Sequence, residues 1–273
     1  MANSSPLVDI MMKAARAGSR TLVRDFGEVE NLQFSRKGPA DFVSHADKMA
    51  EEKIFESLRQ DRPGYNYLME ERGAVKGTDK THRFIIDPLD GTLNFMHGNP
   101  HFAISIGVER EGVLHAGVIY DIIRDEMFHA ETGKGAFIID NRGMEKRLRI
   151  PGRKDFTQCV FATGAPWAGK PGHTQFLREL HKIMGKSAGI RRNGSAALDL
   201  AWFAAGRFNG YWERDLKPWD IAAGIVIVRE AGGVAEDIDT GDKDLFKTGN
   251  IICAHMDMLP KFRETLGIDA PNK

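Results

Sequence analysis

Six short apolar segments, separated mostly by turns that contain glycine, follow one another in the first half of the chain. They span residues 65–69, 83–86, 102–108, 114–120, 126–130 and 135–139. Short apolar runs bounded by turn residues are typical of β-strands, and this succession predicts a largely antiparallel sheet. Because the strands are clustered after helical segments instead of alternating with them, the chain is expected to form an α+β layered fold.

Two helical patterns precede these strands. Apolar side chains recur at helical spacing over residues 7–28, which predicts an amphipathic first helix. A second helix is predicted from Ser44 to about Gln60, because the Ser44 hydroxyl can cap its first turn and Asp47 falls at the third helical position. The sequence Arg-Pro-Gly at 62–64 then ends it.

The second half of the chain mixes the two kinds of element. Its length of 273 residues is near the size at which one core divides, so we expect two subdomains, residues 1–148 and 149–273. A Gly-Gly pair at 232–233 is expected to end one of its helices. The predicted strands lie at 159–163, near 190, at 208–212 and at 250–254, and the predicted helices at 173–184, 195–205, 218–231 and 256–266.

The charges and cysteines exclude several classes of protein. Lys plus Arg and Asp plus Glu each total 38, so no global field favours nucleic acid or anionic membrane, and no direct nucleic-acid binding is expected. The N-terminus lacks the features of a signal peptide and no apolar run is long enough to span a bilayer, which predicts a cytoplasmic protein without a membrane partner. Cys159 and Cys253 lie in apolar stretches and are expected to be buried thiols.

Acidic residues stand at the ends of three predicted elements. Glu70 and Glu71 follow one strand, Asp87 and Asp90 follow the next, and Asp220 falls in the first turn of a helix. Hard cations such as Mg²⁺ prefer oxygen ligands, whereas acids gathered without a metal repel and raise one another's pKa. Taken singly, each signal has a simpler explanation. Glu70 and Glu71 can be a surface pair, the Asp87–Asp90 segment a solvated turn, and Asp220 a helix N-terminal acid.

The segment Asp87–Thr92, "DPLDGT", combines features of a metal site and a phosphate site. Pro88 restricts the backbone, and the spacing allows both Asp side chains to turn to one side with the Leu89 carbonyl between them. Gly91 permits close approach of a ligand, and the amides of Gly91 and Thr92 can hold a phosphate at the start of a short helix.

In their order along the chain, these motifs resemble the inositol monophosphatase family of lithium-sensitive, Mg²⁺-dependent phosphatases. The resemblance implies a layered αβαβα sandwich with the metal cleft between subdomains, and a homodimer. The continuation Leu93-Asn94-Phe95 resembles the inositol monophosphatase branch of the superfamily. The matching stretches are "DFVSHADKMAE" (41–51), "EE" (70–71), "DPLDGTLNF" (87–95), "GSAALDLAWFAAGRFNGYWE" (194–213) and "KPWDIAAGIVIVREAGG" (217–233).

Carried over position by position, the resemblance implies that the protein binds two or three Mg²⁺ ions and uses three catalytic residues. Glu70 and Thr92 would activate water, with Asp47 beside Thr92. Thr92 can also be a helix cap, which is compatible with that role, and Asp47 can equally be only a helix N-terminal acid. Gly91 and Thr92 would bind phosphate. The implied metal ligands are Glu70, Asp87, the Leu89 carbonyl, Asp90 and Asp220.

The implied substrate pocket is built mostly from the second half. Glu213 would bind ring hydroxyls, although it can also be an exposed carboxylate at a strand end, and residues 194–195 can be an ordinary turn and cap. Arg72, Ala165 and Asp215 depart from the family's usual residues, which bears on inositol specificity. The implied substrate-binding residues are Asp90, Gly194, Ser195, Ala196, Glu213 and Asp220.

These features predict a phosphomonoesterase that hydrolyses inositol monophosphates and related polyol phosphates by attack of an activated water. Two alternatives remain open. One is a broader sugar phosphatase of the fructose-1,6-bisphosphatase or histidinol phosphatase type. The other is a regulatory protein that contacts RNA polymerase or antitermination factors, as the resemblance also allows.

Overall fold

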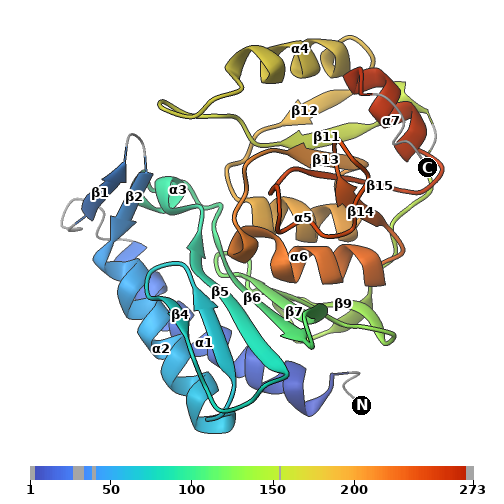
Figure 1. Ribbon diagram of the computed structural model, residues 1–273. Coiled ribbons are helices and arrows are strands. Elements are labelled where there is room, and N and C mark those ends of the chain that lie inside the picture. The colour runs from blue at the N-terminus through green and yellow to red at the C-terminus, as the bar shows by residue number, and fades with distance from the viewer. Residues whose placement is uncertain (1–3, 27–33, 39–40, 154, 269–273) are drawn as a thin grey trace.

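The chain folds into five layers, which alternate between helices and sheets (Figure 1). The computed structural model describes residues 4–26, 34–38, 41–153 and 155–268. This arrangement confirms the expected αβαβα sandwich. The outer helices are α1 (Pro6–Phe26) and α2 (His45–Asp61) on one side and α4 (His173–Met184) and α7 (Leu259–Leu266) on the other, and the middle layer holds α5 (Ala196–Ala204) and α6 (Pro218–Glu230).

The first sheet has eight strands in the order β10-β9-β8-β7-β6-β5-β3-β4. Every neighbouring pair is antiparallel except β3 and β5, so the expected antiparallel sheet is confirmed. The strands are β3 (Asn66–Met69), β4 (Gly73–Val75), β5 (His82–Asp90), β6 (Ala103–Arg110), β7 (Val113–Asp121), β8 (Glu126–Glu131), β9 (Gly135–Ile139) and β10 (Glu145–Arg147).

The second sheet has five strands in the order β12-β11-β13-β15-β14. Strand β11 runs parallel to both of its neighbours, and the other pairs are antiparallel. The strands are β11 (Val160–Thr163), β12 (Gly189–Arg191), β13 (Gly210–Glu213), β14 (Val234–Asp237) and β15 (Ile251–Ala254). The remaining elements are the hairpin β1 (Phe34–Gly38) and β2 (Asp41–Ser44), the helix α3 (Thr92–Met96) and a 3₁₀ turn, Phe156–Gln158.

Helix α6 is the centre of the fold because both sheets pack on it. It contacts β6 and β7 of the first sheet and β14 of the second, and residues 221–228 are all buried. A helix that is apolar on every side is expected where protein surrounds it. One core cluster therefore joins the two sheets, while separate clusters lie under the outer helices.

Several boundaries differ from the sequence predictions. Helix α2 begins at His45, directly after the predicted cap residue Ser44, so Asp47 is its third residue as expected, whereas α7 begins at Leu259, three residues later than expected. Strands β4, β10 and β14 and the hairpin were not predicted. Strand β10, for example, has the sequence Glu-Lys-Arg and carries no apolar pattern, so its pairing with β9 is what makes it a strand.

The predicted division into two subdomains remains a proposal. The first sheet ends at Arg147 and the second begins at Val160, which agrees with a boundary near residues 148–149, although the middle core joins both parts. Cys159 and Cys253 are buried free thiols, as expected. Among the helices described, none is both long and apolar enough to cross a bilayer.

Close packing of α6 on the first sheet requires glycine at Gly117. A Cβ atom there would lie 2.7 Å from Cα of Ala223. We expect Gly117→Ala to lower the free energy of unfolding by about 1–3 kcal/mol, measured by urea denaturation, because the helix backbone would have to move. Gly185→Ala is the matched control, since φ is −72° there and a Cβ would have ordinary contacts at 3.8 Å. An equal loss in both variants would contradict this account.

Candidate active site

Strand pairing brings two of the acidic segments to one edge of the first sheet. Strands β3 and β5 are parallel, with Met69 opposite Ile86, so Glu70 and Asp87 follow side by side where this pairing ends. The Glu70 amide donates a hydrogen bond to the Ile86 carbonyl at 3.2 Å. The sequence placed these acids after two successive strands, and the parallel register is what makes them neighbours.

The segment from Asp87 to Asp90 is an irregularity in the sheet. Asp87 pairs with Ser105 and Asp90 with Ala103, so β5 carries an extra residue opposite β6. The Leu89 amide donates to Asp87 Oδ1 at 2.9 Å, which fixes the turn. Gly91 follows with φ of 98°, and a Cβ there would lie 3.0 Å from the His101 carbonyl oxygen. Glycine is thus required at this position for two independent reasons.

The fourth acid, Asp220, comes from helix α6, which packs on the first sheet. Asp220 lies in its first turn and accepts a hydrogen bond from the Lys217 amide at 2.7 Å. The preceding residue, Trp219, is tied to the first sheet through its carbonyl, which accepts from Ser105 Oγ at 3.2 Å. The helix N-terminus is therefore held beside the edge that carries Asp87 and Asp90.

The four carboxylates are close enough to affect one another's ionisation. Asp87 is only 2% exposed, and burial, followed by the charges of Glu70, Asp90 and Asp220, raises its pKa well above the usual range. Burial and then the charge of Asp90 raise the pKa of Asp220. Such a cluster is costly without a cation, and an all-oxygen donor set fits a hard divalent ion.

The side chains are not, however, arranged as a finished metal site. Among the described residues, no three His, Cys, Asp or Glu side chains have the arrangement that holds a metal ion. Two of the acids are instead held by hydrogen bonds to the protein, since Lys217 binds Asp220 and the start of α5 binds Asp90. Carboxylates turn readily about their side-chain bonds, so these four acids could reorient toward a cation bound between them.

Asp90 is anchored by the first turn of α5. Its Oδ2 accepts hydrogen bonds from Ser195 Oγ at 2.5 Å and from the Ala197 amide at 2.7 Å. Burial raises the pKa of Asp90 to about 6, and these hydrogen bonds oppose the rise. Ser195 also caps α5 through the Leu198 amide. Ser195 and Ala196 are buried here, so the structure places them behind Asp90 instead of on an open pocket wall.

Thr92 and Asp47 are brought together, as the resemblance implied. Thr92 Oγ1 lies 3.0 Å from Asp47 Oδ1 and 3.1 Å from the Leu89 carbonyl oxygen. Asp47 is fully buried in α2. The Thr92 hydroxyl thus has an acceptor on either side, and its position is fixed relative to Leu89.

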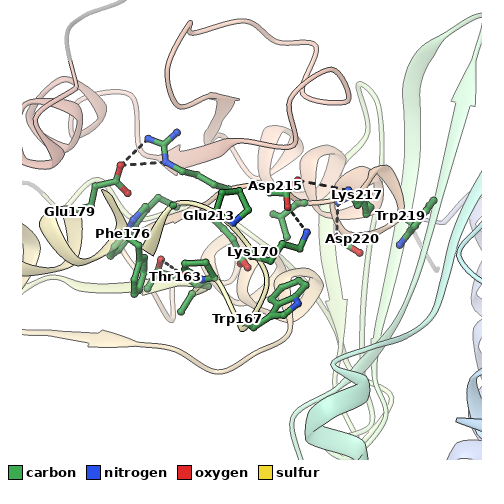
Figure 2. A pocket seen from close by; sticks show the side chains of 18 of the residues that line it. Thr163, Trp167, Lys170, Phe176, Glu179, Glu213, Asp215, Lys217, Trp219 and Asp220 are labelled. Atoms are coloured by element: carbon green, nitrogen blue, oxygen red, sulfur yellow. Dashed lines mark hydrogen bonds and ion pairs between the residues drawn. The ribbon is translucent and has the colours of Figure 1, made fainter. Parts of the chain in front are cut away.

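A cavity of about 500 Å³ opens beside these acids, between the end of the first sheet and the second sheet (Figure 2). Glu70, Asp220 and Glu213 line it. Glu213 comes from the end of β13, and its Oε2 accepts a hydrogen bond from the Tyr211 hydroxyl at 2.5 Å. Burial raises the pKa of Glu213 to about 7, while this hydrogen bond lowers it. The predicted pocket residues 194–196 are not among the residues that line the cavity.

Two supporting residues were missed from the sequence. Asn94 Nδ2 donates to the carbonyl oxygens of His101 at 2.7 Å and Asn193 at 2.8 Å, which joins α3 to the loop before α5. Glu51 is buried and accepts from the Glu71 amide at 2.8 Å, which holds the turn after β3. The signals for Glu51 were its place one helical turn after Asp47 and at the end of the matching stretch 41–51.

Comparisons with known proteins identify the family of the chain. The model of the inositol monophosphatase family matches residues 3–267. The chain is 53% identical to an inositol-1-monophosphatase of Caulobacter vibrioides, over 94% of this chain and 99% of the relative, and 40% identical to the Nus factor SuhB of Escherichia coli, over 92% and 91%. The crystal structure of the extragenic suppressor protein suhB from Bartonella henselae superimposes with a TM-score of 0.91 at 50% identity, covering 96% of this chain and 98% of that one. The inositol monophosphatase from Anabaena gives 0.82 at 32% identity, covering 97% and 96%. The chain therefore belongs to the inositol monophosphatase family.

Proposed function

We propose that this protein is a metal-dependent phosphomonoesterase that hydrolyses inositol monophosphates and related polyol phosphates. The observation that carries the proposal is the set of mutually interacting acids, Asp87, Asp90 and Asp220, beside a cavity of about 500 Å³. Relatives named inositol-1-monophosphatase at 49–53% identity support the substrate class.

The metal proposed for this site is Mg²⁺, as two or three ions. The carboxylates of Glu70, Asp87, Asp90 and Asp220 and the Leu89 carbonyl would hold them. When bound, these ions neutralise the acids, lower the pKa of water and stabilise charge on the phosphate and the leaving oxygen. We propose that lithium inhibits by competing at the same ligands.

The chain's own groups would then position water and substrate. Glu70 and the Thr92 hydroxyl would orient the attacking water and take up its proton, with Asp47 accepting the Thr92 hydrogen bond at 3.0 Å. The amides of Gly91 and Thr92 would bind phosphate oxygens at the start of α3. Glu213, held by Tyr211, would accept hydrogen bonds from polyol hydroxyls in the cavity.

Phosphate release tests the proposal directly. Purified protein with Mg²⁺ is expected to hydrolyse inositol-1-phosphate faster than glycerol-2-phosphate, fructose-1,6-bisphosphate or histidinol phosphate, and EDTA is expected to abolish each activity. Preference for a sugar bisphosphate would favour the broader sugar phosphatase. Failure to release phosphate from any ester would refute the enzymatic proposal.

A second function is proposed on the strength of the relatives named Nus factor SuhB. As a cytoplasmic homodimer, the protein would contact RNA polymerase or antitermination factors without using its phosphatase site. Capture of polymerase subunits from a lysate by both the wild type and an inactive metal-ligand variant would support this, whereas capture by neither would refute it.

A further inference from the structure

The loop that carries Glu70 lies at the outer edge of the first sheet. Residues 70–72 join β3 to the edge strand β4, and Met69 pairs with Gly73 across the loop. Gly73 has φ of 76°, a left-handed conformation that favours glycine. Because β4 has a hydrogen-bonded neighbour on one side only, contacts from outside the sheet are needed to fix the direction in which Glu70 points.

One such contact comes from a buried acid of helix α2. Glu51 is only 2% exposed, and its Oε2 accepts a hydrogen bond from the Glu71 amide at 2.8 Å. Burial raises the pKa of Glu51, and the hydrogen bond from the Glu71 amide opposes that rise. A hydrogen bond to an ionised acceptor is stronger than one between neutral groups. The backbone next to Glu70 is therefore held firmly against the helix.

Arg72 fastens the other end of the same loop. Its guanidinium group makes an ion pair with Glu52 and lies 4.7 Å from the centroid of the Phe55 ring, and its Nε lies 4.0 Å from Glu51 Oε1. All three partners belong to α2. Arg72 is not among the residues that line the cavity. The unusual residue at position 72 therefore points to attachment of the loop instead of inositol specificity.

The same helix also holds the other group proposed to orient water. Asp47 lies one helical turn before Glu51, so the two side chains share one face of α2. Asp47 accepts the Thr92 hydrogen bond at 3.0 Å, while Glu51 holds the loop beside Glu70. The separation between Glu70 and Thr92 is therefore tied to the fixed spacing of two residues along one helix.

We propose that Glu51 is a positioning residue which, together with Arg72, sets the place of Glu70 and thereby the affinity of the site for the cation that Glu70 holds. This inference rests on the proposed metal site, in which Glu70 is a ligand. Loss of a residue that orients a metal ligand typically weakens metal binding by about 10- to 100-fold. Glu51 does not line the cavity, so its effect is expected to pass through Glu70.

Calorimetric titration with Mg²⁺ in the absence of substrate measures this effect without any turnover. Glu51→Ala is expected to raise the Mg²⁺ dissociation constant by about 10- to 100-fold. Glu51→Gln, which keeps an acceptor for the Glu71 amide, is expected to recover most of the affinity, and Arg72→Ala to show a smaller rise. Leu58→Ala removes a buried side chain from the same helix. This control is expected to unfold at lower urea and to bind Mg²⁺ as the wild type does.

A double-mutant cycle with Glu70→Ala shows whether the effect passes through Glu70. Glu51→Ala is expected to weaken Mg²⁺ binding when Glu70 is present and to cause no further loss in the Glu70→Ala background. The same loss in both backgrounds would mean that Glu51 acts elsewhere, and it would overturn the positioning role.

The outcomes separate the positioning role from the metal site itself. If Glu70→Ala weakens Mg²⁺ binding but Glu51→Ala does not, the positioning role is refuted and the metal site stands. If Glu70→Ala binds Mg²⁺ as the wild type does, the proposed ligand fails and the positioning role fails with it. Should Glu51→Ala not fold, Arg72→Ala decides the matter, and a dissociation constant equal to that of the wild type overturns the proposal.

Discussion

Asp87→Asn is expected to lower kcat/KM for inositol-1-phosphate by about 10³-fold, equivalent to about 4 kcal/mol of transition-state stabilisation. The substitution keeps the volume and an acceptor oxygen for the Leu89 amide, but it removes one ligand charge. In EDTA the same variant is expected to be more stable than the wild type at neutral pH, because Asn removes the cost of ionising a carboxyl whose pKa burial and the neighbouring acids raise. Steady-state kinetics and denaturation with and without Mg²⁺ measure the two effects.

Asp121→Asn provides the control for this result. Asp121 is equally buried, but it is paired with Arg124 at 3.1 Å and lies away from the cavity. Its replacement is expected to lower stability with and without Mg²⁺ and to leave the kinetics unchanged. The metal-site account would be wrong if Asp87→Asn kept its activity within about tenfold of wild type, or if Mg²⁺ stabilised that variant as much as the wild type.

Gly164→Ala is expected to reduce activity by displacing Glu213, the side chain proposed to bind the substrate ring. A Cβ at Gly164 would lie 1.7 Å from Glu213 Oε1, so the Glu213 carboxylate would have to leave its place beside Tyr211. We expect kcat/KM for inositol-1-phosphate to fall by about 10- to 100-fold, through loss of charge-assisted hydrogen bonds to the ring. Unfolding free energy is expected to fall by no more than about 1–3 kcal/mol, because the displaced group is the end of a flexible side chain but the buried Tyr211 hydroxyl loses its acceptor.

Tyr211→Phe tests the same contact without adding volume. It removes the donor to Glu213 and is expected to give a smaller loss in kcat/KM of the same kind. Glycerol-2-phosphate, which has fewer hydroxyls, is expected to be less affected by Gly164→Ala than inositol-1-phosphate is. An equal loss for both substrates, or a variant that unfolds at much lower urea, would contradict a role for Glu213 in ring recognition.

The parts of the fold that could be predicted are those whose pattern is local. Helix α6 and strand β5 are marked by continuous apolar runs, and their burial on all sides follows from where they pack. Strand β10 could not be found, because the sequence Glu-Lys-Arg becomes a strand only through pairing with β9. The order of the layers could be predicted only from the resemblance to a known family, since no local sequence pattern indicates which face of a sheet a helix will cover.

The same distinction applies to the candidate site. The acids were identified because they end predicted strands or begin a helix, positions that can be seen in the sequence. The contact between Asp90 and Ser195 joins residues 105 positions apart, and it depends on how α5 meets the first sheet. The place of Glu213 depends likewise on the absence of a side chain at Gly164, which directly follows a different strand, β11. Neither contact has a signature in the sequence near it.

The burial of α6 between both sheets also affects how the chain acquires its structure during synthesis. The eight strands of the first sheet are complete at Arg147, yet the helix that covers their inner face begins only at Pro218. Until residues 218–230 leave the ribosome, side chains such as Ile119 and Phe128 lack their native cover. Such a nascent chain exposes apolar surface that is prone to aggregation and suited to chaperone binding. Native packing of the first sheet therefore waits for α6, and Asp220 reaches the other acids in that same late step.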